Sequence, residues 1–134
     1  MKKVFASIVA VLALSSTAFA GGNYKVDVKA PSGAKKGEKA TAKLHLEGTG
    51  GFHVNTEYPA KLTITAPAGV KLEKASQTGK EAAKFAKEGA DFDIAFTSAD
   101  AGTKEFTGEF KFAVCTDANC APATEKVSFK VDVK

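Results

Sequence analysis

The sequence predicts an all-β protein in which two antiparallel sheets pack face to face. Three observations support this fold class. Apolar and polar residues alternate along most of the chain, glycine- and proline-rich stretches separate the alternating runs, and only one segment has a helical composition. Strict alternation indicates strands with one buried and one solvated face, and many short strands between such turns are typical of a β-sandwich.

The first alternating run is YKVDVK, with Tyr24, Val26 and Val28 on one face. Further runs occupy residues 39–47, 51–55, 61–66, 69–74, 91–97, 105–114 and 126–133. Turn signals separate them, including APSGAKKGE, EGTGG, APAG and SADAGT. The exception is GKEAAKFAKEGA at residues 79–90, which is long enough for only about three helical turns. We expect a short helix or an irregular crossing between the sheets there.

The first 20 residues have the organisation of a secretory signal peptide. The segment begins MKK, continues with an apolar run at residues 4–14 and ends with AFA at residues 18–20. The apolar run is shorter than the roughly 20 residues that a membrane-spanning helix requires. We therefore predict a signal peptide at residues 1–20 and a single domain at residues 21–134. The protein is expected to be periplasmic or secreted, with no membrane span in the mature chain.

The charge pattern argues against nucleic acid as a partner. The 19 basic residues are all lysines, and they alternate along the chain with 15 acidic residues. Nucleic-acid-binding proteins favour arginine and concentrate their basic residues on one face. No serine–histidine–acid set or pair of carboxylates stands out, so the sequence supports neither a hydrolase nor a cofactor site.

The two cysteines, Cys115 and Cys120, lie near the C-terminus in VCTDANCAP. In an oxidising compartment, cysteines at this spacing are expected to be joined. Closing a loop of about six residues removes only about 2 kcal/mol of unfolded-chain entropy. This small contribution favours a reactive disulfide over a structural one, while the spacing alone leaves both interpretations open.

A hairpin that places the two cysteines opposite each other also predicts the register of the last two strands. It sets Phe106 against Phe129, so that the apolar faces of both strands coincide. It also sets Phe110 against Glu125, a mismatch that a bulge near Pro122 would repair.

The segment VCTDANCAP resembles the cysteine hairpin in the N-terminal periplasmic domain of the DsbD family of thiol:disulfide interchange proteins. GFHVNTEYPAKLTITAPAGV resembles an early Gly-aromatic-His stretch of the same family, which is followed by a proline and an alternating strand. The resemblance implies an immunoglobulin-like antiparallel β-sandwich in a stand-alone homologue. It also implies that Cys115 and Cys120 are a redox pair that exchanges electrons with thioredoxin-like partners.

Four further residues are candidates for a lid over the pair or for its support: Phe52, His53, Tyr58 and Asp117. Phe52 and Tyr58 flank HVNTE and would form an aromatic lid, or else Phe52 belongs to the core and Tyr58 to a half-exposed loop. Asp117 would disfavour a neighbouring thiolate by charge repulsion, while nearby lysines would favour it. His53 and the two cysteines could also bind copper together, so a copper site is an alternative. Oxidised cysteines are unavailable as ligands, however, so we expect no metal and no cofactor.

Two functions from different classes fit these features. The first is an exported thiol–disulfide exchange module that passes electrons through the Cys-x4-Cys hairpin to or from thioredoxin-like or other periplasmic thiol proteins. The second is a non-catalytic secreted binding module whose disulfide is structural.

The exported protein is expected to begin at Gly21, because the basic start and the Ala-x-Ala end of the leader match the pattern that signal peptidases cleave. Intact-mass spectrometry of the protein recovered outside the cytoplasm measures this directly. A mass that includes residues 1–20 would contradict the prediction.

Overall fold

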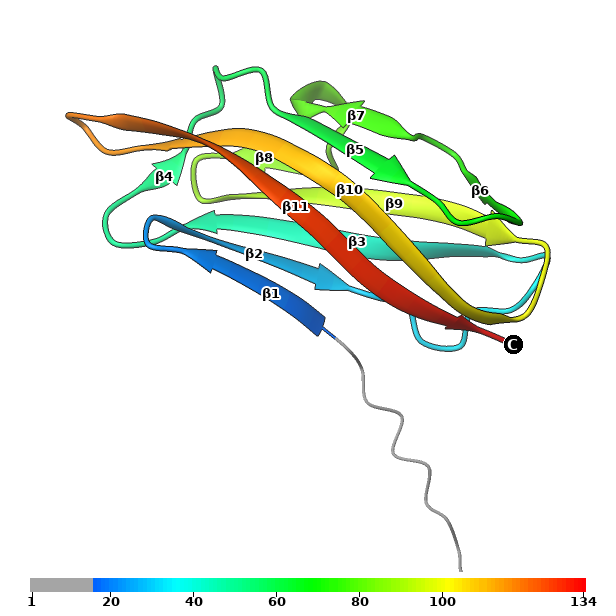
Figure 1. The fold of residues 1–134 in the computed structure, drawn as a ribbon. Coiled ribbons are helices and arrows are strands. Elements are labelled where there is room, and N and C mark those ends of the chain that lie inside the picture. The colour runs from blue at the N-terminus through cyan, green and yellow to red at the C-terminus, as the bar shows by residue number, and fades with distance from the viewer. Residues whose placement is uncertain (1–15) are drawn as a thin grey trace, which may run out of the picture.

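The computed structural model describes residues 16–134, so residues 1–15 of the predicted signal peptide lie outside the described residues. The chain folds into two antiparallel sheets that pack face to face (Figure 1). The predicted immunoglobulin-like antiparallel β-sandwich is thereby confirmed. Within residues 16–134, no helix has both the length and the apolar character that crossing a membrane requires.

The first sheet has the strand order β1-β2-β3-β9, with β6 and β8 paired to opposite ends of β9. Its strands are β1 (Ser16–Gly21), β2 (Tyr24–Lys29), β3 (Lys39–Gly48), β6 (Val70–Leu72), β8 (Lys84–Ala86) and β9 (Gly89–Ser98). The second sheet has the order β11-β10-β5-β7, with β4 paired to the end of β10. Its strands are β4 (His53–Val54), β5 (Lys61–Thr65), β7 (Ser76–Thr78), β10 (Gly102–Cys115) and β11 (Cys120–Val133). Every run that the alternation predicted forms a strand.

Residues 79–90 do not form an α-helix. A single 3₁₀ turn at Gly79–Glu81 follows β7 in the second sheet, and β8 then joins the first sheet. The expected crossing between the sheets is confirmed, and the helix alternative is wrong. Phe85 in β8 packs against the core, and its ring carbon lies 2.6 Å from where a Cβ on Gly79 would stand. Tertiary packing of this ring therefore overrides the helical composition.

Strand β1 contains the last residues of the predicted signal peptide. It pairs antiparallel with β2 and sets Phe19 opposite Val26. Cleavage after Ala20 would remove this strand except for Gly21 and would leave β2 at the edge of the sheet. The signal peptide itself stays a prediction.

The hairpin of β10 and β11 has the predicted register over its whole length. Phe106 lies opposite Phe129, and Phe110 lies opposite Glu125. The expected bulge near Pro122 is wrong, because Pro122 takes its place in the unbroken ladder. Strand β11 is at the edge of its sheet, so the missing N–H of proline leaves no ladder bond unmade.

Glu125 is accommodated by a residue from the other sheet. The Tyr24 hydroxyl donates a hydrogen bond to the Glu125 carboxylate, and the Tyr24 ring contacts Phe112 edge-on with centroids 4.8 Å apart. Burial, the hydrogen bond and the negative charge of Glu125 raise the pKa of Tyr24 to about 12. A half-buried carboxylate on the inward side of β11 is therefore satisfied by a donor from the other sheet.

Aromatic rings fill the space between the sheets. Phe106 stacks on Phe129 with centroids 4.8 Å apart, and Phe96 and Phe92 of β9 contact Phe106 and Phe110, respectively. The residues predicted to point inward are all at most 2% exposed, which confirms the prediction. They are Phe106, Phe110, Phe112, Phe129 and Val131.

Replacing Phe129 with alanine is expected to lower the free energy of unfolding by about 3–5 kcal/mol, because it removes a buried ring that stacks on Phe106. Denaturant unfolding of the purified protein measures the change. The matched control is Lys130→Ala, an exposed neighbour on the same strand, with an expected change within about 0.5 kcal/mol. An unchanged midpoint for Phe129→Ala would contradict the buried position of the ring.

Tyr24 is expected to ionise with a midpoint at about pH 12 in a Tyr58→Phe variant, where it is the sole tyrosine. Its folded pKa is raised above the ordinary value of 10.0, so its contribution to stability is complete below about pH 10 and disappears as the pH rises through 12. Ultraviolet titration measures the midpoint, and Glu125→Gln is expected to lower it. An ordinary midpoint in the Tyr58→Phe variant would refute the contact with Glu125.

Candidate functional site

The two cysteines form a disulfide at the tip of the β10–β11 hairpin, which Figure 1 shows projecting from one end of the sandwich. The inward side chains of β10 include Phe112 and Val114, so Cys115 and its partner Cys120 stand on the outer face of the sheet. The bond therefore lies outside the core.

The two sulfur-bearing residues differ in exposure. Cys115 is 5% exposed, because β10 is an interior strand that pairs with β11 on one side and with His53 of β4 on the other. Cys120 is exposed, because it begins the edge strand β11. An incoming nucleophile therefore meets the Cys120 side of the bond.

The loop between the cysteines is held by its own polar groups. The Thr116 N–H donates to the Asn119 carbonyl (2.7 Å), and the Thr116 hydroxyl accepts from the N–H groups of Ala118 (3.3 Å) and Asn119 (3.1 Å). These bonds satisfy the loop backbone without a contribution from the core. The loop conformation therefore depends on hydrogen bonds between residues of the loop itself.

Of the four candidate support residues, His53 lies nearest to the pair in the ladder, directly opposite Cys115 and on the same face. Phe52 is half-buried and packs against the core. Tyr58 is half-buried in the segment after β4, and Asp117 is exposed in the hairpin loop. The structure therefore sets His53 beside Cys115, leaves Asp117 exposed in the loop and directs Phe52 towards the core.

Asn55 contacts the disulfide, and the sequence analysis missed it. Its side-chain amide nitrogen lies 4.0 Å from the Cys120 sulfur. Its amide oxygen accepts hydrogen bonds from the N–H groups of Glu57 (2.9 Å) and Tyr58 (3.3 Å), and its own N–H donates to the Ala113 carbonyl (2.9 Å). Asn followed by Thr-Glu-Tyr-Pro is a sequence signal for such an Asx turn, but it gives no indication of the contact with Cys120.

A close backbone approach directs β4 to the disulfide. A Cβ atom on Gly48, at the end of β3, would lie 2.2 Å from the Phe52 carbonyl oxygen. Only glycine fits there, and the chain can therefore leave the first sheet and reach β10 within a few residues. The Val54 N–H then donates to the Lys87 carbonyl at 3.0 Å, which ties β4 to the first sheet.

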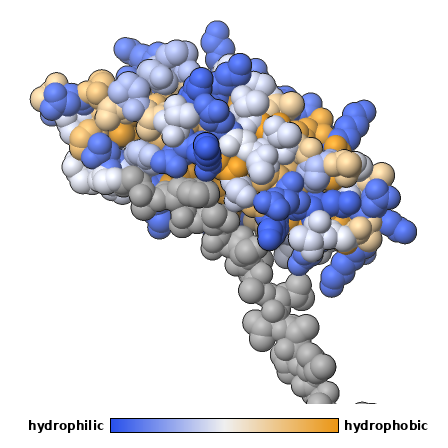
Figure 2. Space-filling view, in the orientation of Figure 1, coloured by the Kyte–Doolittle hydropathy of each residue, from blue (hydrophilic) through white to orange (hydrophobic). Residues whose placement is uncertain are grey.

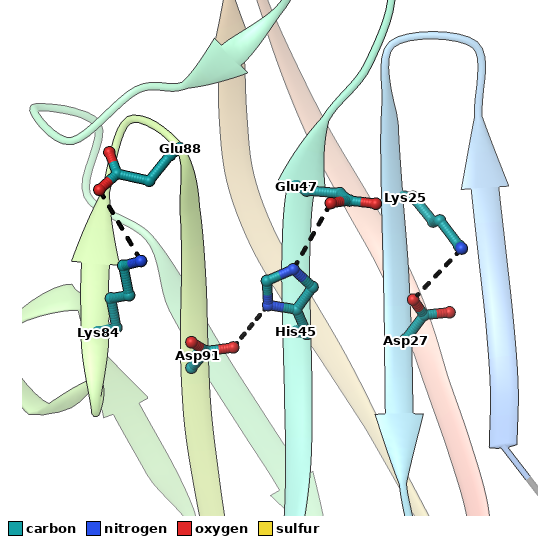
Figure 3. A network of polar contacts seen from close by, with 7 residues as sticks. All are labelled: Lys25, Asp27, His45, Glu47, Lys84, Glu88 and Asp91. Carbon is teal, nitrogen blue, oxygen red and sulfur yellow. Dashed lines mark hydrogen bonds and ion pairs between the residues drawn. The ribbon is translucent and has the colours of Figure 1, made fainter.

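The second histidine belongs to a separate polar cluster on the outer face of the first sheet (Figure 3). His45 Nδ1 lies 2.6 Å from an Asp91 oxygen, and Nε2 lies 3.7 Å from a Glu47 oxygen. In the part of the chain that the structure describes, no group of three or more histidine, cysteine or acidic side chains is arranged to hold a metal ion. The cluster is half-buried and belongs to the other sheet from the cysteine hairpin.

A shallow hollow of about 540 Å³ lies on the outer face of the second sheet, over β5, β10 and β11. Three lysines and four hydroxyl residues line much of it: Lys61, Lys111, Lys126, Thr63, Thr65, Thr107 and Ser128. Figure 2 shows hydrophilic, near-neutral and hydrophobic residues intermixed on the face of the molecule in view. The hollow combines amine and hydroxyl groups with a larger aliphatic side-chain surface, and it does not include the cysteines.

No protein-family model and no curated protein matches the chain. Among solved structures, the GAE domain of GGA2p from Saccharomyces cerevisiae has 12% identity and a TM-score of 0.53, covering 86% of this chain and 97% of that one. PapD-like domain 7 of human CEP192 has 12% identity and a TM-score of 0.41, covering 81% and 83%. The fimbrial subunit AggA from Escherichia coli has 6% identity and a TM-score of 0.41, covering 90% and 96%. At this identity, the likeness to the GAE domain shows the fold alone.

Proposed function

We propose that the protein is an exported thiol–disulfide exchange module, a stand-alone homologue of the N-terminal periplasmic domain of the DsbD family. The observation that carries the proposal is the asymmetric disulfide, with Cys115 buried and Cys120 exposed on an edge strand. Exchange requires that one sulfur be accessible to an attacking thiolate. The resemblance of VCTDANCAP to the family's cysteine hairpin supports the same function.

The exchange takes place in two steps. A thiolate of a reduced thioredoxin-like partner attacks the Cys120 sulfur, the bond to Cys115 breaks, and Cys115 leaves as a thiolate that takes a proton. The second thiol of the partner then loses its proton and attacks the partner's sulfur in the mixed disulfide, which releases Cys120 as a thiolate. Two electrons have then passed to this protein, and the partner is left as a disulfide. The reverse sequence passes the electrons on to an oxidised thiol protein.

The position of the disulfide suits repeated opening. The bond closes a short loop whose backbone is held by Thr116, and the ladder of β10 and β11 continues beneath it into the core. The bond contributes only about 2 kcal/mol by loop closure, against the 5–15 kcal/mol stability of a typical domain. The reduced protein is therefore expected to keep its fold.

The alternative is a secreted binding module with an inert disulfide. The observation that favours it is the hollow over the second sheet, where three lysines and several hydroxyl groups stand on a largely aliphatic surface. A redox test separates the two functions, because a binding module has no need of a reducible bond.

Incubation of the oxidised protein with a reduced thioredoxin-like domain is expected to produce free thiols at Cys115 and Cys120. A Cys115→Ser variant leaves only the exposed cysteine. It is expected to form a stable mixed disulfide with a Cys-x-x-Cys partner whose second cysteine is replaced by serine and whose first has been activated as a disulfide with an aromatic thiol, which is the leaving group. The matched control, Cys120→Ser, retains only the buried cysteine and is expected to trap far less. Thiol counting and non-reducing electrophoresis measure these outcomes. A bond that stays oxidised for hours would contradict the proposal and favour the binding module.

The Cys115→Ser, Cys120→Ser double variant is expected to remain folded, with a free energy of unfolding lower by about 2 kcal/mol. Circular dichroism and denaturant unfolding measure the change. An unfolded double variant would show that the disulfide is required for the fold and is therefore structural.

A further inference from the structure

We propose that Asn55 donates a hydrogen bond to the Cys120 sulfur and thereby stabilises the Cys120 thiolate whenever that thiolate forms. The proposal rests on the proposed exchange function and assigns to it a residue outside the cysteine hairpin. Asn55 lies 65 residues before Cys120 in the chain, and its Nδ2 atom lies 4.0 Å from the sulfur.

The orientation of the Asn55 amide follows from its other contacts. Its oxygen faces two backbone donors, the N–H groups of Glu57 and Tyr58, at 2.9 and 3.3 Å. An amide turned by half a rotation would place its NH₂ group against these two donors, which is unfavourable. The oxygen is therefore held in the turn, and the NH₂ group is left facing Cys120.

The backbone of Asn55 is fixed as firmly as its side chain. Its N–H donates to the Ala113 carbonyl at 2.9 Å, which extends the pairing of β4 with β10 by one step beyond Val54. Cys115, two residues after Ala113, pairs with Cys120 in the β10–β11 ladder, and this pairing does not depend on the disulfide. The donor and the sulfur are thus both attached to the end of β10, so little ordering is needed for the contact to form.

A neutral N–H donor beside a sulfur favours the charged form of that sulfur. In the exchange sequence, Cys120 is the thiolate that leaves when the mixed disulfide resolves, and it is the attacking thiolate when the reduced protein passes electrons on. Asn55 stabilises the same thiolate in both directions. The titratable side chains on the elements around Cys120 include His53 on β4, Glu57 and Tyr58 in the turn, Lys111 on β10, Glu125 on β11 and Asp117 in the hairpin loop.

The test measures the rate of Cys120 alkylation by iodoacetamide against pH in the Cys115→Ser background, where Cys120 is the only thiol. Asn55→Ser removes the amide donor but keeps an oxygen that can accept from the turn and adds no charge. The midpoint of its rate profile is expected to rise by about half a pH unit. Asn55→Asp keeps the turn and replaces the donor with a carboxylate, and its midpoint is expected to rise by about one unit or more.

Asn119→Ser is the matched control, since it makes the same change beside Cys120 in the hairpin loop, and its midpoint is expected to stay at the parent value. His53, Glu57 and Asp117 are identical in all variants, so their effects cancel in the comparison. Thermal unfolding confirms that each variant is folded. If the Asn55→Ser profile superimposes on that of the parent, Asn55 only builds the turn and the inference is overturned.

The outcome for Asn55 is separate from the outcome for the proposed function. Alkylation by a small reagent needs no partner protein, so the profiles report on the contact with Cys120 even if thioredoxin-like domains fail to reduce the disulfide. Failure of that reduction overturns the exchange function. Identical profiles with successful reduction overturn the role of Asn55 and leave the exchange function in place.

Discussion

The ladder between β10 and β11 keeps one register from Cys115–Cys120 to Gly102–Val133, and the rest of the structure depends on it. Side chains alternate between the two faces of a strand, so one register decides which residues are buried and which cysteines meet. The register that stacks Phe106 on Phe129 in the core also sets Cys115 opposite Cys120 on the outer face. A shift of one residue would expose the phenylalanines and separate the sulfurs. Core packing therefore enforces the geometry of the candidate site from a distance.

The same register turns a carboxylate inward, and a residue of the other sheet hydrogen-bonds to it. Glu125 falls on the inward side of β11, opposite Phe110, where an unpaired carboxylate would be costly. Tyr24 reaches it from β2 and supplies both an aromatic edge to Phe112 and a hydroxyl donor. Both side chains are only half-buried, and partial solvation lowers the cost further. The hairpin thus accommodates Glu125 without the bulge near Pro122 that the sequence had suggested.

Whether a feature could be predicted from the sequence depends on how far apart its residues lie along the chain. The eight alternating strands, the hairpin register and the inward phenylalanines were predictable, because a two-residue period is a local signal. The short strands β7 and β8 were missed, since three residues are too few to establish a period and their pairing depends on neighbours. Tyr24 and Glu125 are 101 residues apart, and Asn55 and Cys120 are 65 apart. Only the folded arrangement brings such pairs together, so neither contact could be predicted.

The fold and the candidate chemistry occupy different parts of the molecule. A sandwich of this kind is shared with a domain that is only 12% identical, so the architecture by itself carries no activity. The residues of the candidate site lie at one end, where an edge strand, an interior strand and the turn after β4 meet at the disulfide. Because that bond lies on the outer face, we expect its reduction to leave the aromatic core intact. Under the proposed exchange function, side chains such as Asn55 would adjust the reactivity of the pair without a matching change in the stability of the sandwich.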